Sequence, residues 1–149
     1  MSYVRFGAMI VTSTVVMFLL MYLNVYSVDH IYWSETRAYM AVIMGATMAV
    51  VMLAFMLGMY ANRALNVAIF GASAVAFVLA LYLVRSQETV DDLAWMKAMI
   101  PHHSIAILTS ERAHISDPRV RELADQIIRS QREEIEEMKS LITELQGRR

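Results

Sequence analysis

The sequence contains no cysteine, which excludes disulfide bonds, thiolate metal sites and cysteine nucleophiles. It also lacks a glycine-rich phosphate-binding loop, a serine nucleophile elbow and a stripe of basic residues. The formal net charge of −1 argues against a nucleic-acid partner. We therefore expect neither an organic cofactor nor nucleic-acid binding. The absence of a catalytic signature favours a protein that is not an enzyme.

Charged residues are absent from three long apolar runs, which cover residues 6–26, 38–60 and 64–84. The hydrocarbon core of a bilayer is about 30 Å thick, and a helix needs about 20 apolar residues to cross it. Each run is long enough, and the first exceeds the roughly 7–15 apolar residues of a secretory signal. The sequence therefore predicts a three-helix transmembrane anchor over residues 1–85, with the lipid bilayer as its partner.

The arginines beside the runs bear on the orientation of this anchor. Arg5 precedes the first run and Arg63 lies between the second and the third, whereas Arg37 and Arg85 lie toward the other side. Basic residues favour the cytoplasmic side, and these four nearly balance. The short segment before the first run favours a cytoplasmic N-terminus. Because the number of runs is odd, the C-terminal region then lies on the opposite side of the membrane.

Small residues and methionines recur every four positions within the second and third runs. Small residues at this spacing let helices approach each other closely. The small residues are Ala41, Gly45 and Ala49, followed in the third run by Ala64, Ala68, Ala72, Ala76 and Ala80. The methionines are Met40, Met44, Met48, Met52 and Met56. This methionine row is either a ladder of thioethers that carries Cu(I) or Ag(I) across the membrane or flexible apolar packing.

Most charged residues lie in residues 86–149, which predicts a soluble second domain. A first helix is expected from about Thr89 to Ala113. The pair Asp117 and Pro118 is a strong start signal for a second helix, because aspartate caps a helix and proline suits its first position. The sequence therefore predicts an all-α protein in which the anchor is followed by an antiparallel helical hairpin.

The second expected helix has one apolar stripe at helical spacing. The stripe consists of Val120, Leu123, Ile127, Ile135, Met138, Ile142 and Leu145. Two helices alone cannot enclose a core, so another element must cover the apolar face. We expect a homo-oligomer, most simply a dimer that closes a four-helix bundle.

The residues with the most informative chemistry lie in the first helix of the hairpin. Helical spacing puts Met96, Met99 and His103 on one face, with His102 about 100° away. Antiparallel pairing brings this face opposite the segment between Gln131 and Met138, with His103 nearest Ile128 and Gln131. Thioethers, imidazoles, a carboxylate and an amide therefore converge. Thioethers favour Cu(I) and Ag(I), and imidazole also accepts Cu(II) and Zn(II). The alternative is structural, because methionines at core spacing usually pack and a lone histidine is usually a satisfied polar group.

The stretch D-x-x-W-M-x-x-M-I-P-H-H from Asp92 to His103, with Q-x-x-E-I-x-x-M from Gln131 to Met138, resembles the domain-of-unknown-function family 305. The resemblance implies a ferritin-like hairpin in bacteria, often outside the cytoplasmic membrane, with some members linked to copper. Ser104 departs from the glutamine that is frequent there in the family. The metal-binding positions that the resemblance implies are Met96, Met99, His102, His103, Gln131, Glu134 and Met138.

These observations predict a membrane-anchored, extracytoplasmic metal-binding protein that buffers, hands over or confers tolerance to copper or silver. It would lie in a bacterial cytoplasmic (inner) membrane, with the hairpin on the periplasmic or extracellular side. One alternative is a non-catalytic oligomerisation or interaction module on a membrane anchor. Another is a di-metal carboxylate oxidase, but Glu111 to His114 is the single E-x-x-H sequence and further inward carboxylates are lacking.

Overall fold

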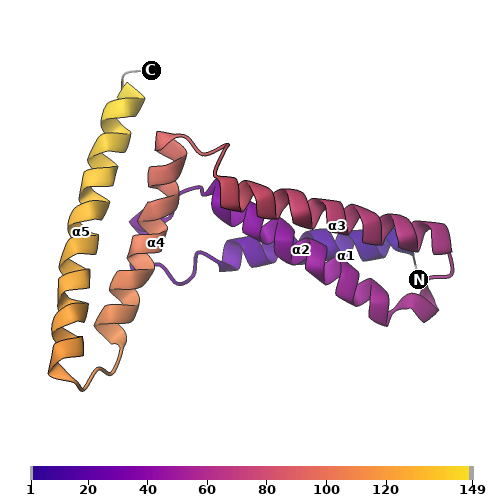
Figure 1. The fold of residues 1–149 in the computed structure, drawn as a ribbon, viewed down its shortest axis with the longest axis horizontal. Helices are drawn as coiled ribbons and strands as arrows, with labels where there is room; N and C mark the ends of the chain where they lie inside the picture. Colours follow the sequence, from indigo (N-terminus) through magenta and orange to yellow (C-terminus); the bar gives the residue numbers. More distant parts are fainter. Residues whose placement is uncertain (1, 148–149) are drawn as a thin grey trace. The chain divides into compact units, whose positions relative to one another are not determined.

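The computed structural model describes residues 2–147 as helices joined by short loops (Figure 1). The α-helices are α1 (Tyr3–Leu20), α2 (Glu35–Phe55), α3 (Arg63–Ser86), α4 (Asp92–Arg112) and α5 (Pro118–Gly147). Two short 3-10 helices, η1 (Val28–His30) and η2 (Leu57–Met59), lie in the loops that follow α1 and α2. No strand occurs among the described residues, so the prediction of an all-helical protein is confirmed.

The first three helices are long and apolar enough to cross a membrane, as the sequence predicted. They contain 18, 21 and 24 residues. At about 1.5 Å per residue, these helices are roughly 27 to 36 Å long. The hydrocarbon core of a bilayer is about 30 Å thick, so each helix matches the distance to be crossed.

Close packing of α1 against α2 depends on Gly45. A Cβ atom at this position would collide with the Thr14 side chain, and in particular with its hydroxyl oxygen. Ala41 and Ala49, one turn to either side of Gly45, are also buried. The small-residue face predicted on α2 is therefore an interior face. In the alanine row of α3, the buried member is Ala80.

The chain forms two compact units that do not follow the order of the sequence. The first contains α1 up to Met21 together with Thr36–Thr89. The second combines Tyr22–Glu35 with the residues from Val90 onward. The segment Tyr22–Glu35, named the α1–α2 loop below, therefore packs with α4 and α5. A division of the chain at residue 85 alone would leave this loop with the first three helices.

The N-terminus of α4 differs from the sequence-based prediction. The helix starts at Asp92, because Asp91 is the N-cap and its carboxylate accepts a hydrogen bond of 2.8 Å from Ala94 N. The expected start at Thr89 is wrong, since the Thr89 hydroxyl is instead hydrogen bonded to the Tyr39 hydroxyl at 2.8 Å. Two aspartates at the start of α4 suit the positive end of the helix dipole.

The start of α5 agrees with the prediction. The helix begins at Pro118, and the Asp117 carboxylate accepts a hydrogen bond of 2.9 Å from Arg119 N. The Arg119 guanidinium also bonds to this carboxylate, and both contacts lower the pKa of Asp117. These local contacts fix the point at which the chain reverses direction between α4 and α5.

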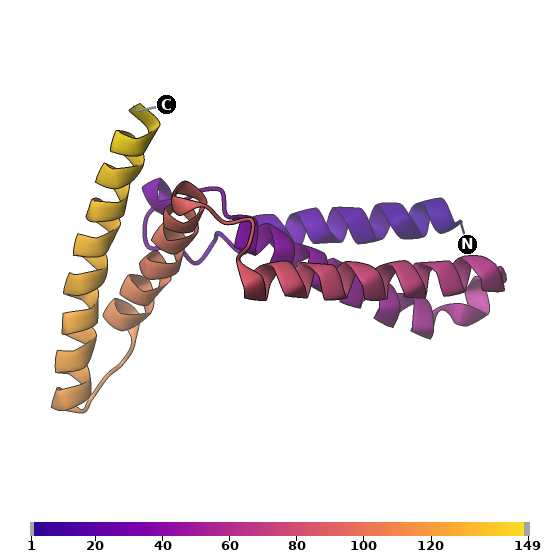
Figure 2. The ribbon, with the colours of Figure 1, turned by 45° about the horizontal axis from the view of Figure 1, so that its top comes forward.

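α4 and α5 lie side by side along their length, as Figures 1 and 2 show from two directions. A seam of buried apolar side chains joins them, and Tyr32 of the α1–α2 loop packs against it. The seam consists of Leu93, Met96, Ile100, Ile107, Ile135, Met138 and Ile142. Intervals of three, four and seven residues put these positions on one face of each helix. Val120 and Leu123, at the other end of the predicted stripe, are exposed.

Candidate metal centre

Three candidate metal ligands are thioethers in or beside the seam between α4 and α5. Met96 and Met138 are buried there, and Met99 is partly buried against the same cluster. The structure therefore brings together the three methionines that the sequence singled out. Their position is also one that ordinary core side chains occupy, so burial alone does not assign them a function.

His103 on α4 faces Glu134 on α5. The distance from His103 Nδ1 to Glu134 Oε2 is 3.1 Å, and the His103 side chain is 12% exposed. The contact is an ion pair only when the ring is protonated, and Nδ1 makes no hydrogen bond within the described part of the chain. The site therefore contains a buried ring nitrogen with unused bonding capacity beside a carboxylate.

Glu134 is held in place by its own helix. Ser130 Oγ donates a hydrogen bond of 2.7 Å to Oε1, and Gln131 Nε2 donates one of 3.4 Å to Oε2. Sequence pairing had put His103 nearest Ile128 and Gln131. In the structure, the side chain that meets the imidazole is Glu134, and Gln131 lies beside it as a donor that orients the carboxylate.

Burial lowers the pKa of His103 from its ordinary value of 6.5. Glu134 acts in the opposite direction by favouring the imidazolium, and His102 adds to the lowering. The net effect favours the neutral ring, whose nitrogen lone pair is the group that binds a metal ion.

His102 is exposed and lies outside this group of side chains. Its ring centroid is 6.1 Å from that of His103, and consecutive side chains on a helix point about 100° apart. The structure therefore brings His103, Gln131 and Glu134 together and leaves His102 facing solvent.

Within residues 2–147, no three histidine, aspartate or glutamate side chains lie close enough to hold a metal ion. A metal centre at His103 would therefore need thioethers. Met99 lies one turn before His103 on α4, and Met138 lies one turn after Glu134 on α5. Side chains four residues apart are neighbours on a helix, with Cβ atoms about 5–6 Å apart. Met99 and Met138 therefore lie within one helical turn of the polar pair, and a metal centre here would draw on nitrogen, oxygen and sulfur donors together.

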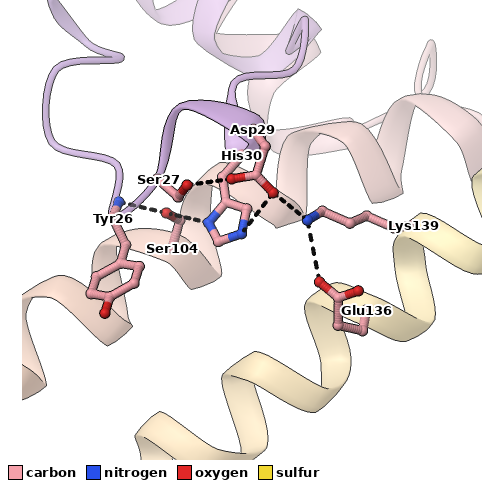
Figure 3. Close-up of polar contacts among 7 residues, drawn as sticks. All are labelled: Tyr26, Ser27, Asp29, His30, Ser104, Glu136 and Lys139. Carbon is pink, nitrogen blue, oxygen red and sulfur yellow. Dashed lines mark hydrogen bonds and ion pairs between the residues drawn. The ribbon is translucent and has the colours of Figure 1, made fainter.

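A second polar cluster, which the sequence did not predict, connects the α1–α2 loop to both helices (Figure 3). Tyr26 N donates a hydrogen bond of 2.7 Å to Ser104 Oγ, which lies 2.9 Å from His30 Nδ1. On α5, Lys139 Nζ donates a hydrogen bond of 2.6 Å to Asp29 Oδ2. The partners are more than 70 residues apart in the sequence, and no spacing rule pairs residues at such a distance.

Residues 83–148 match the family described as Domain of unknown function (DUF305). This part of the chain is a DUF305 domain. It begins in the last turn of α3 and includes α4 and α5, so the family resemblance of the histidine and methionine motifs is confirmed.

One relative of the chain is Uncharacterized protein L153 of Acanthamoeba polyphaga mimivirus, which is 42% identical over 69 residues. The match covers 45% of this chain and 45% of the relative. The chain therefore aligns with less than half the length of that protein. No solved structure matches the chain significantly.

Proposed function

We propose that the DUF305 domain binds a soft metal ion, copper(I) or silver(I), between α4 and α5. The observation that supports this most directly is the buried Nδ1 of His103, which lacks a hydrogen-bond partner among the described residues and lies 3.1 Å from Glu134. An unpaired buried polar atom costs about 1–3 kcal/mol. Coordination of a cation by this nitrogen would offset that cost.

The proposed ligands are His103, Met99 and Met138, with Met96 in the same seam. Thioether sulfur favours Cu(I) and Ag(I) over harder ions. Methionine has three rotatable side-chain bonds, so its sulfur turns toward a bound ion more readily than a branched side chain could move. Glu134 supplies negative charge beside the cation, and Gln131 and Ser130 hold that carboxylate in position. His102 stays a predicted ligand whose side chain would have to turn inward.

The proposed role is buffering, handover or tolerance of the ion at a bacterial cytoplasmic membrane. Three apolar helices of sufficient length support a membrane anchor. With the N-terminus in the cytoplasm, the odd number of helices carries the DUF305 domain to the periplasmic or extracellular side. The ion is therefore cargo that the domain would meet outside the cytoplasm.

Metal titration of the full chain in detergent micelles tests this proposal. Ag(I), and Cu(I) under reducing conditions, would be added in competition with a chelator of known affinity. We expect His103→Ala to weaken binding by about 100-fold. His114→Ala is the matched control, because His114 is exposed beside the turn between α4 and α5. Equal affinities for the two variants would contradict the proposal, and tighter binding of Zn(II) than of Cu(I) would contradict the choice of metal.

A second candidate function is oligomerisation through a ferritin-like four-helix bundle. Apolar side chains that the chain leaves exposed on α4 and α5 support it, namely Trp95, Val120, Leu123 and Leu141. A second copy could cover these side chains. Cross-linking and native mass measurement in mild detergent test this function, and detection of the monomer alone would contradict it.

A further inference from the structure

The α1–α2 loop contacts α4 and α5 at the same time. On α4, the fully buried Ser104 hydroxyl oxygen accepts a hydrogen bond from Tyr26 N–H and faces His30. On α5, the Lys139 ammonium lies between Asp29 and Glu136, at 2.6 and 3.2 Å. Figure 3 shows these side chains converging from the three segments. The loop thus bridges the two helices on one side of the apolar seam.

Arg132 on α5 strengthens the same attachment. Its guanidinium lies 3.3 Å from the Tyr26 hydroxyl and 5.6 Å from the centre of the Tyr26 ring. Tyr32 adds an apolar contact, because it packs against the seam. The loop is therefore held by both polar and apolar contacts, and His30 lies at their centre with 8% of its surface exposed.

Ser104, His30 and Asp29 have the residue types of a hydrolase triad, but their geometry does not support catalysis. The Ser104 side chain is 0% exposed, so no substrate reaches its oxygen. His30 Nε2 is 3.8 Å from Asp29 Oδ2, which is beyond hydrogen-bond distance. This cluster is therefore an attachment between segments of the chain.

Protonation of His30 would disturb this attachment. In the neutral tautomer that carries its proton on Nε2, the Ser104 hydroxyl donates to Nδ1 while its oxygen accepts from Tyr26 N–H, so both groups in this contact are satisfied. In the imidazolium, both ring nitrogens are donors. Ser104 Oγ would then face two donors, and its own hydrogen would lose its acceptor inside the protein. A buried donor without an acceptor destabilises the arrangement that creates it.

Charges of both signs surround His30. Asp29 in the loop and Glu136 on α5 favour the imidazolium, whereas Lys139 on α5 opposes it. Arg132 on α5 lines the same hollow of about 330 Å³ as His30, and the group that α4 presents is the uncharged Ser104 hydroxyl. Burial has the largest effect, and it lowers the pKa of His30 from 6.5. The hollow gives protons from solvent a route to the ring.

We propose that the α1–α2 loop is a pH-sensitive clasp on the DUF305 domain. The clasp holds α4 and α5 together while His30 is neutral and detaches when His30 is protonated. Because the loop continues into α1 and α2, detachment leaves residues 87–91 as the remaining link between the apolar helices and the α4–α5 pair. The clasp requires no bound metal, so it is independent of the proposed metal-binding function.

Distance measurements on the full chain in lipid nanodiscs test the clasp. The sequence has no cysteine, so Val28→Cys and Glu137→Cys introduce two unique spin-label sites, both at exposed positions. We expect a narrow distance distribution at about pH 7.5 and a broad one at about pH 5. These two values lie on either side of the pH at which histidine ordinarily titrates. The ratio of docked to detached loop should fall about tenfold per pH unit below 6.5, until the pKa of the docked state is reached.

Two histidine variants of the spin-labelled chain decide the outcome. His30→Gln cannot titrate, so its distribution should be the same at both pH values, whether it is narrow or broad. His114→Gln, at an exposed histidine, should behave like the parent chain. An unchanged distribution in the parent chain would overturn the proposal, as would a pH response that persists in His30→Gln or disappears in His114→Gln. Loss of helix content at the lower pH would also overturn it, because unfolding would then explain the broadening.

Discussion

His30 and His103 share several features but differ in the hydrogen bonding of Nδ1. Both are largely buried, both have a carboxylate within 4 Å, and burial lowers the pKa of both. His30 Nδ1 lies 2.9 Å from Ser104 Oγ, whereas His103 Nδ1 has no hydrogen-bond partner in the described structure. Burial and a nearby carboxylate therefore do not distinguish a structural histidine from a candidate ligand. The bonding of the ring nitrogen does.

The two rings also face different elements. Ser104 follows His103 directly on α4, so their side chains point about 100° apart. One side of α4 therefore presents an imidazole to Glu134 and the thioethers, while the adjacent side presents a hydroxyl to the α1–α2 loop. If this comparison is correct, a change at one histidine should leave the other site unaffected.

The largest difference should appear in stabilisation by metal. Ag(I) in free concentration about 100-fold above its dissociation constant should raise the free energy of unfolding by about 2.7 kcal/mol. His103→Ala should abolish this increase. His30→Gln should retain it, because His30 is not one of the proposed metal ligands. Thermal denaturation of each protein with and without Ag(I) measures the effect. Loss of the increase in His30→Gln alone would reverse the roles of the two histidines.

A smaller difference is expected in the metal-free protein. Ser104→Ala leaves the buried His30 Nδ1 without its partner, so it should cost about 1–3 kcal/mol in the free energy of unfolding. His103→Leu should cost less than about 1 kcal/mol, because no hydrogen bond is lost and leucine suits the apolar seam. Denaturant titration in the presence of a chelator measures both values. A greater cost for His103→Leu would show that His103 is also structural.

The sequence predicted the His103 side of α4 much better than the His30 side. Helical periodicity puts Met96, Met99 and His103 on one face, and antiparallel pairing brings that face to the segment that contains Glu134. Both rules use short spacings or a single turn, so they work without knowledge of the tertiary fold. The prediction was less accurate in register, because it put Gln131 nearest His103, whereas the imidazole meets Glu134 in the structure.

The His30 side depends on a contact between residues 74 positions apart. In the sequence, Ser104 is notable only as a departure from the family's glutamine, and His30 lies in an irregular loop. Neither residue indicates the other, because irregular loops have no periodicity that fixes which side chains point inward. The oligomer prediction was likewise made without knowledge of where the α1–α2 loop packs. It rested on the need to cover the apolar face of two helices, and Tyr32 of the loop supplies part of that cover within one chain.

Substitution of one neighbouring charge in each site should move the two histidine pKa values in opposite directions. Glu134→Gln removes a carboxylate that favours the imidazolium, so the pKa of His103 should fall further below 6.5. Lys139→Met removes a positive charge that opposes the imidazolium, so the pKa of His30 should rise. NMR titration of the imidazole resonances of the full chain measures both shifts. Each variant should leave the other histidine unchanged, and movement of both rings by one substitution would show that the sites are coupled.

The smallest effect concerns Asp29, which links Lys139 to the loop. The hydrogen bond from Lys139, with a further one from Ser27, lowers the pKa of Asp29 from 3.8 to about 2. Because the pKa is lowered, the attachment gains stability above about pH 3.8 and loses it as the pH falls toward 2. Lys139→Met should return the pKa of Asp29 most of the way to 3.8, as measured by carboxyl ¹³C NMR. Asp29 is largely exposed to solvent, which screens the ion pair, so the effect on stability should be small beside that of Ser104→Ala. An equal or greater loss of stability in Lys139→Met would place the main attachment of the loop on α5 and not at His30.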